Sequence, residues 1–344
     1  MKHKISFITE KAQQNDGIFN YSANNPINRD DGVFPFHLLK QSLVAADIII
    51  GTQDIIQPED ADILIFFDYP DNFEKYPQNK KKFLIVTECE LIKPENWKPQ
   101  HHNQFNKIFT WNDNFIDNKK YFKLNFSNKI STTNPENEKR KSFCCLIAGN
   151  KSVSHPNELY SKRVETIRWF EKNAASDFDL FGIGWDLYQF RGPLLIRALN
   201  RVQFLRKLLA PQYSSYKGRV QSKLKTLSEY QFSICFENAQ NIPGYITEKV
   251  FDAFFAGCIP VYWGAPNVTD WIPSDCFIDF RKFKNYEELY SFMKSLSIEE
   301  ITNYQKNILN YLNSEKVKPY TAEYFAKTLT TEIIKTLSEK SVQT

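Results

Sequence analysis

Residues 238–264 read NAQNIPGYITEKVFDAFFAGCIPVYWG and combine a loop, an amphipathic segment and an apolar run. The apolar positions of the amphipathic segment have the spacing of one helix face, and they are Ile246, Val250, Ala253 and Phe254. Gly257 suits the position just after a helix end, and the run from Cys258 has the composition of a buried strand. With the apolar run from Phe232 before it, this stretch predicts a strand, a helix and a second strand of a parallel sheet.

The start of this predicted helix has the residues of an anion site. Lys249 stands in the first turn, where unpaired backbone N–H groups and the helix dipole already favour negative charge, so a lysine there indicates a bound phosphate or diphosphate. Glu248 can accept hydrogen bonds from sugar hydroxyls, and Tyr245 offers an aromatic face and a hydroxyl. Ligands of open α/β sheets bind at the carboxyl ends of the strands. We therefore expect Glu237 and Asn238, which end the preceding strand, at the same crevice.

Short apolar runs that predict strands recur along the whole chain. They lie near residues 5, 48, 64, 85 and 109, and again near 143, 178, 232, 258 and 276. Between the two sets, residues 125–142 are polar and charged, which is typical of an interdomain linker. We expect two parallel-sheet α/β domains, residues 1–124 and 143–318, each with helices on both faces of its sheet, and a C-terminal helical segment over 319–344. The pattern is typical of the GT-B architecture, in which two Rossmann-like domains face each other across a cleft, but other paired Rossmann-like proteins fit it equally well.

Composition excludes some classes of partner. The 44 Lys and Arg residues nearly balance the 40 Asp and Glu residues. Because nucleic-acid binding needs a concentrated basic face, the overall charge does not indicate a nucleic-acid-binding protein. No apolar run has the length of a signal peptide or of a membrane span, and we expect a cytoplasmic protein. The six cysteines have no C-x-x-C spacing, which favours buried reduced thiols.

Residues 191–219 read RGPLLIRALNRVQFLRKLLAPQYSSYKGR, in which seven basic residues alternate with apolar ones and no acidic residue occurs. A basic amphipathic helix of this kind can lie on an anionic membrane surface. The alternative is that its apolar stripe packs on the second domain while the arginines face water or phosphate. Both interpretations stay open.

The sequence does not predict a metal site. Two D-x-D triplets, Asp60 to Asp62 and Asp177 to Asp179, precede their strands, so they lie at the amino ends, away from the expected ligand crevice. The five histidines lack the spacing of a zinc motif. Gly182 and Gly184 follow a predicted strand, but a G-x-G pair alone is too weak a signal to count as a phosphate loop.

The run from Phe232 to Phe283, FSICFENAQNIPGYITEKVFDAFFAGCIPVYWGAPNVTDWIPSDCFIDFRKF, resembles the donor-binding signature of the α-1,3-fucosyltransferase family, family 10 of the glycosyltransferases. The shared pattern is FEN, a GY-x-TEK turn and a following P-V/I-Y-W-G strand. The sequence departs from the pattern at Ala239, where family members often have serine, and in the insert Asn241–Pro243 before Gly244.

This resemblance implies a GT-B enzyme that transfers L-fucose from GDP-fucose, with inversion, to a sugar hydroxyl of an oligosaccharide or glycolipid acceptor. By the same likeness, Lys249 contacts the diphosphate, Glu248 contacts the ribose, and Asn238 and Tyr245 line the donor pocket. A family arginine that contacts the donor phosphate matches Arg163, with Arg168 as the alternative. No cofactor is implied.

An inverting transfer needs a base on the face opposite the leaving group. Glu88 follows the predicted strand FLIVT and resembles the glutamate that bacterial family members carry there; Glu90 is the alternative. We expect the polar loop Lys11–Asp31 to reach the acceptor. The hydroxyl that receives the fucose is expected to be O3 of an N-acetylglucosamine or glucose unit. Two other functions stay open: another inverting GT-B nucleotide-sugar transferase, and a catalytically silent protein that binds sugar nucleotides or glycans.

Overall fold

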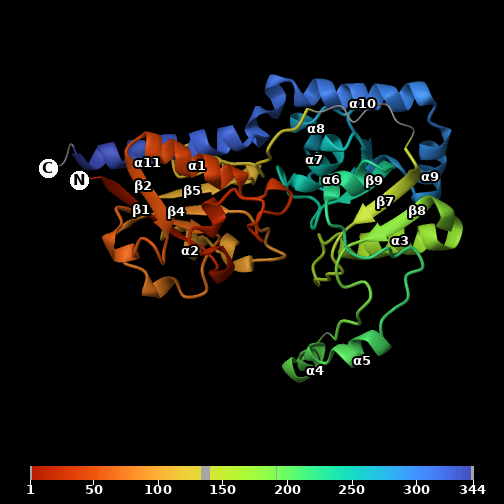
Figure 1. Cartoon of the computed structure of the whole chain (residues 1–344), viewed down its shortest axis with the longest axis horizontal. Helices are drawn as coiled ribbons and strands as arrows, with labels where there is room; N and C mark the ends of the chain where they lie inside the picture. The colour runs from red at the N-terminus through yellow and green to blue at the C-terminus, as the bar shows by residue number, and fades with distance from the viewer. Residues whose placement is uncertain (1, 133–139, 191, 342–344) are drawn as a thin grey trace.

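The computed structural model of the chain describes residues 2–132, 140–190 and 192–341, with side chains up to residue 339. These residues form two α/β domains, which lie side by side along the long axis of the molecule (Figure 1). Each domain is built on one sheet whose strand pairs are all parallel. The predicted α/β class with two parallel sheets is confirmed.

The first sheet has six strands in the order β2-β1-β3-β4-β5-β6. Their bounds are β1 His3–Ile8, β2 Ile48–Thr52, β3 Ile63–Phe67, β4 Lys81–Val86, β5 Lys107–Thr110 and β6 Tyr121–Lys123. The apolar runs predicted the first five strands. The edge strand β6 escaped prediction because it is three residues long and only half-buried, so it lacks a run of apolar residues.

One face of this sheet is covered by helices from opposite ends of the chain, α1 (Phe34–Ala45) and α11 (Ala322–Ser341), which pack on each other (Figure 1). Their buried side chains join those of the strands in one apolar core, in which Leu39 and Leu329 are fully buried. The connections from β2 to β5 instead contain short turns of 3₁₀-helix and the short helix α2 (Pro99–His102). Aromatic side chains such as Phe66 and Phe105 fill that other face. The expectation of helices on both faces is therefore wrong for this domain, because aromatic loops bury that face without them.

The 3₁₀ turns of the chain are short, and most connect strands to the loops around them. Their bounds are η1 Lys11–Gln13, η2 Gly17–Phe19, η3 Arg29–Asp31, η4 Pro58–Asp60, η5 Phe73–Lys75, η6 Pro94–Trp97, η7 Asp113–Phe115, η8 Ala175–Asp177, η9 Leu199–Arg201, η10 Phe280–Lys282 and η11 Glu315–Tyr320.

The second sheet has five strands in the order β11-β10-β9-β7-β8. Their bounds are β7 Ser142–Ile147, β8 Phe178–Phe181, β9 Tyr230–Phe236, β10 Ile259–Trp263 and β11 Ile278–Asp279. The helices of this half are α3 Tyr160–Asn173, α4 Leu194–Ala198, α5 Gln203–Leu208, α6 Lys223–Leu227, α7 Glu248–Phe255, α8 Val268–Trp271, α9 Tyr286–Ser295 and α10 Ile298–Leu312. Side chains of α7 and α10 belong to one apolar core, and those of α3 and α9 belong to another. All five predicted strands are present.

The chain passes between the domains twice, and the two passages are hydrogen-bonded to each other. The backbone N–H of Asn128, in the predicted linker, donates to the carbonyl of Tyr320 at 2.8 Å, and the N–H of Ala322 donates to the carbonyl of Asn128 at 3.0 Å. Residues 133–139 of that linker lie outside the described residues. At its far end, Arg140 donates to the carbonyl of Ala256 at 2.9 Å, just past the end of α7.

A small apolar cluster joins the domains directly. Cys89, Leu91 and Trp111 of the first domain contact Ala239 and Tyr245 of the second. The rings of Trp111 and Tyr245 are 4.6 Å apart between centroids. The loop before α7 is therefore held from both domains.

Residues 192–210, which we call the arm, stand away from the second domain (Figure 1). The arm contains two short helices, α4 and α5, rather than one long amphipathic helix, and Arg191 before it lies outside the described residues. Its large apolar side chains are exposed; Leu194 is 82%, Leu195 86% and Phe204 77% exposed. The interpretation that this apolar stripe packs on the second domain is therefore wrong.

The base of the arm is held by two reciprocal contacts with the segment before it. Asn200 exchanges hydrogen bonds with the backbone of Phe190, at 2.9 and 2.8 Å. Tyr188 donates its N–H to the carbonyl of Arg206, whose Nε donates back to the carbonyl of Tyr188 at 2.9 Å. These contacts fix where the arm leaves the domain.

All six cysteines are free and buried, as predicted. Within the described ranges, no helix combines the length and the apolar character needed to cross a bilayer.

Candidate active site

A cavity of about 820 Å³ lies between the two domains, and we call it the interdomain cavity. The residues that the sequence favoured as base and donor ligands all line it: Glu88, Arg163, Asn238, Tyr245, Glu248 and Lys249. Glu88 comes from the first domain and the others from the second. The structure thus brings together residues that are up to 161 positions apart in the sequence, from Glu88 to Lys249.

A buried carboxylate organises the wall formed by the second domain. Glu237, at the end of β9, is 0% exposed and accepts hydrogen bonds from the backbone N–H of Thr247 at 2.8 Å and from its hydroxyl at 2.7 Å. Lys249 donates to the same carboxylate at 3.1 Å. The expectation that Glu237 faces the crevice is wrong; its side chain points into the protein and fixes the start of α7. A Cβ atom on Gly264 would lie 2.5 Å from the Cγ of Glu237, so the carboxylate needs glycine there.

Lys249 and Glu248 form the charged entrance of α7. Burial alone would lower the pKa of Lys249, but the carboxylates of Glu237 and Glu248 outweigh it and the pKa lies above its usual value. Desolvation would raise the pKa of Glu248, but Lys249 and Lys223 hold it at about 2. Both side chains are therefore charged at neutral pH. The ammonium group lies at the helix end whose backbone N–H groups also attract anions.

Arg163, on α3, is buried and points to the end of β9. It donates to the carbonyl of Phe236 at 2.6 Å and to the side-chain oxygen of Asn238 at 3.0 Å. The alternative, Arg168, lies one and a half turns further along α3, where it pairs with Glu171 and covers the ring of Tyr213 at 3.8 Å. Arg168 does not line the interdomain cavity. The structure favours Arg163.

Tyr245 lines the cavity but presents little of its surface, because it is only 1% exposed. Its ring packs against Trp111 of the first domain, and the preceding Gly244 makes this contact possible. Gly244 has a positive φ of 81°, and a Cβ atom there would lie 2.3 Å from the carbonyl oxygen of Trp111. Tyr245 therefore contributes to the domain contact as well as to the cavity wall.

Glu88 lies at the carboxyl end of β4, as the sequence predicted for a residue facing the crevice. Its backbone is fixed by Asp68, which accepts from the N–H of Glu88 at 3.3 Å, and by Trp97, which donates to its carbonyl at 3.1 Å. Burial raises the pKa of Glu88, and the nearby charge of Asp68 raises it further, against opposing effects of Lys151 and Lys249. A carboxylate whose pKa is raised in this way is suited to accept a proton. Glu90, the alternative, is exposed and lies outside the cavity lining.

Much of the positive charge in the cavity could not be predicted from the sequence. Five further basic side chains line it: Arg29, Lys151, Arg206, Arg219 and Lys223. Arg206 and Arg219 belong to the basic run over residues 191–219. Their position at the cavity depends on how that long segment folds, which the sequence pattern does not predict. Gly182 and Gly184, which we did not count as site residues, also line the cavity. The G-x-G pair after β8 is the sequence signal from which their position in the cavity wall could have been predicted.

The polar loop expected to reach an acceptor touches the second domain at the edge of this cavity. Arg29 donates to the carbonyl of Val220 at 3.2 Å, and Asp30 accepts from the backbone N–H of Lys223 at 3.4 Å. The loop therefore borders the interdomain cavity from the first domain.

The two D-x-D triplets lie at the amino ends of their strands, as predicted, and have structural partners. Asp62 accepts from the N–H of Lys4, and Asp177 pairs with Lys294 at 3.0 Å. Among the described residues, no group of three or more His, Cys, Asp or Glu side chains is arranged to hold a metal ion.

The C-terminal part of the chain is similar to a known protein family. Residues 198–341 match the family model described as glycosyltransferase family 10 (fucosyltransferase), C-terminal part. The chain is 38% identical over 101 residues to an alpha-(1,3)-fucosyltransferase of Helicobacter pylori, and 37% identical over 75 residues to an alpha-(1,4)-fucosyltransferase of Arabidopsis thaliana. These matches cover 29% and 22% of this chain and 21% and 18% of the relatives, so the chain spans about a fifth of the curated relatives that it matches.

Solved structures match over nearly the whole chain at low identity. An alpha1,3-fucosyltransferase with GDP has a TM-score of 0.52 at 17% identity, covering 95% of this chain and 88% of that one. A glycosyltransferase from Rickettsia africae has a TM-score of 0.52 at 12% identity, covering 97% and 99%. These likenesses show the fold, and the predicted GT-B architecture is confirmed. Residues 198–341 are thus similar to the C-terminal part of glycosyltransferase family 10, the fucosyltransferases, in a chain with a two-domain GT-B fold.

Proposed function

We propose that the chain transfers L-fucose from GDP-fucose, with inversion, to a hydroxyl of a glycan acceptor, taken to be O3 of N-acetylglucosamine or glucose. The observation that carries the proposal is the interdomain cavity, where the family-matched segment contributes Glu248 and Lys249 and the first domain contributes Glu88. A solved alpha1,3-fucosyltransferase with GDP-fucose has the same fold, with a TM-score of 0.51.

In this proposal the second domain holds the donor. Lys249 and the N-terminus of α7 bind the diphosphate, and Arg163 adds a second positive charge beside Asn238. Glu248 accepts hydrogen bonds from the ribose hydroxyls, which its charged state at neutral pH permits. As the bond between the fucose anomeric carbon and the diphosphate oxygen breaks, negative charge grows on the departing GDP. Fixed cations at that place stabilise the transition state more than the bound substrate.

The first domain holds the base. The acceptor hydroxyl attacks the anomeric carbon from the face opposite GDP, and its proton passes to the carboxylate of Glu88. The proposal is supported by the lining of the cavity, to which the first domain contributes Glu88 and the second domain contributes Arg163 and Lys249. Since the side chains of Arg163 and Lys249 supply the positive charge for GDP, we propose that no metal ion is required.

We also propose that the arm holds the protein at the inner, anionic face of a membrane. The support is its combination of exposed leucine and phenylalanine side chains with arginine and lysine, in a segment without acidic residues. The six free buried thiols suit the reducing cytoplasm.

Lys249→Met is expected to weaken GDP binding by about 10–100-fold, because the variant loses one charge-assisted hydrogen bond to the diphosphate. It also leaves Glu237 as a buried charge without its cation, which should cost about 3 kcal/mol of unfolding free energy. The double variant Glu237→Gln/Lys249→Met removes that buried charge, so it should regain stability but not GDP affinity. Calorimetric titration and denaturant unfolding measure the two effects. GDP affinity at the wild-type level in the folded double variant would rule out Lys249 as a diphosphate ligand.

Glu88→Gln is expected to lower turnover by ~10²–10⁴-fold, as for a lost general base, with GDP affinity unchanged. Wild-type turnover should fall as pH drops through the raised pKa of Glu88, above the usual 4.5, because only the deprotonated form accepts the proton. This acid limb should disappear from the residual activity of the variant. GDP release with an acceptor panel measures both. Glu90→Gln, from the same strand end, is the matched control and should behave as wild type; a loss there instead would reassign the base.

Removal of divalent metals should leave the activity intact. The measurement is GDP release from GDP-fucose after dialysis against EDTA, compared with the same sample to which Mn²⁺ is returned. Equal rates are expected. Loss of activity in EDTA that Mn²⁺ restores would contradict the proposal that side chains alone stabilise the departing GDP.

The double variant Leu195→Ser/Phe204→Ser should reduce binding to vesicles that contain phosphatidylglycerol by at least about 10-fold, because two apolar side chains no longer enter the lipid interface. Co-sedimentation at low and high salt measures it. Ile298→Ser removes an equally exposed side chain, at the start of α10, and should change nothing. Equal binding by all three proteins would show that the arm does not dock on the membrane.

A further inference from the structure

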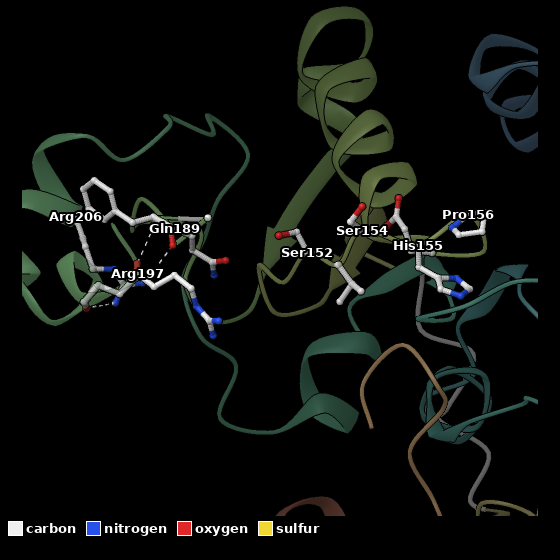
Figure 2. Close-up of a pocket in the computed structure, with 12 residues that line it drawn as sticks. Ser152, Ser154, His155, Pro156, Gln189, Arg197 and Arg206 are labelled. Atoms are coloured by element: carbon white, nitrogen blue, oxygen red, sulfur yellow. Dashed lines mark hydrogen bonds between the residues drawn. The ribbon is translucent and has the colours of Figure 1, made fainter. Parts of the chain in front are cut away.

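The arm forms one side of a second cavity, of about 1060 Å³, which we call the arm cavity. Figure 2 shows Arg197, Arg206 and Gln189 on one side of it and Ser152, Ser154 and His155 on the other. The second side is the loop that follows β7 and leads into α3. The proposed donor chemistry does not use this space.

The charge around the arm cavity is positive. The acidic residue that lines it, Glu158, is engaged elsewhere, since its carboxylate accepts from the backbone N–H of Ser161 at 2.9 Å at the start of α3. Arg206 is held in place by its bond to Tyr188, whereas Arg197 has no ion-pair partner among the described residues. The guanidinium of Arg197 and the hydroxyls of Ser152 and Ser154 therefore offer hydrogen-bond donors on the two sides of the cavity, which suits an anionic ligand.

The arm cavity continues into the interdomain cavity, because Gln189 and Arg206 line both. Lys151 and Arg219 extend the positive surface toward Glu88, and neither has an ion-pair partner in the described part of the chain. The donor diphosphate is already matched by Arg163 and Lys249. A ligand that reaches from the base to the arm is therefore expected to carry negative charge of its own.

We propose that the arm cavity binds a phosphate group of the acceptor, and that the acceptor is a glycan linked to a lipid through a diphosphate. This inference rests on the proposed fucosyl transfer. Arginine binds phosphate with paired hydrogen bonds. The hydrocarbon part of such an acceptor would lie along the exposed side chains of Leu194 and Leu195, which are next to Arg197 on the same short helix. A lipid diphosphate has both features in one molecule, with the anion between the sugar and the hydrocarbon.

The test uses the full chain saturated with GDP, so that the donor site is filled before the probe is added. Binding of farnesyl diphosphate, of inorganic pyrophosphate and of the neutral octyl glucoside is measured by calorimetric titration. Farnesyl diphosphate should bind and octyl glucoside should not. Arg197→Gln should weaken the binding by about 10-fold. Arg201→Gln is the matched control, because it removes the same charge from the same arm outside the cavity lining, and it should change the affinity less than about threefold.

Equal affinity for pyrophosphate and farnesyl diphosphate would support a phosphate site in the arm cavity, but it would contradict the proposal that the phosphate belongs to a lipid. Equal losses in the two arginine variants, or no binding of either diphosphate, would overturn the site itself. The GDP titration that precedes the test reports on the proposed function separately. If GDP does not bind, the fucosyl-transfer proposal fails, whereas binding of the diphosphate probe that depends on Arg197 and not on Arg201 would leave the anion site in place.

Discussion

The buried carboxylate of Glu237 is the constraint on which the candidate site depends. A carboxylate with no exposed surface is stable only if hydrogen bonds and a positive charge replace its lost hydration, and Thr247 and Lys249 supply both. The same contacts fix where α7 begins and where its first cation lies. On the other side, Gly264 leaves the space that the carboxylate occupies. Three pieces of one signature, FEN, TEK and YWG, are thus parts of a single packing arrangement rather than three separate ligand contacts.

The same loop joins the domains. Gly244 lets the chain approach the carbonyl of Trp111, and Tyr245 then packs on the Trp111 ring. The backbone N–H of Asp113 donates to the carbonyl of Pro243 at 3.2 Å, and its carboxylate accepts from Asn267 at 2.9 Å. Because the loop before α7 is bound from both sides, the wall that carries Lys249 and the wall that carries Glu88 are placed relative to each other by the residues that surround the site.

Two passages of the chain strengthen this arrangement at a distance from the cavity. Asn128 pairs with the backbone of residues 320 and 322, and α11 then returns to the first domain and completes its core. The arm is the opposite case, since it is held at its base by Asn200 and Arg206 but leaves its leucines in water. These exposed side chains do not contribute the stabilisation of about 25 cal/mol that each Å² of buried apolar surface provides.

The sequence by itself determined the strands except β6, the α/β class and, with the family resemblance, the residues proposed to act on the donor. Apolar periodicity and the position of polar residues at strand ends are local properties, so Glu88 and Lys249 could be marked before any contact between them was known. Tertiary structure alone decided that Glu237 turns inward, that aromatic loops replace helices on one face of the first sheet, and that the arm is exposed. Each of these depends on which distant side chains compete for the same space or charge. That competition is set by how the two halves of the chain pack together, and no window of sequence contains it.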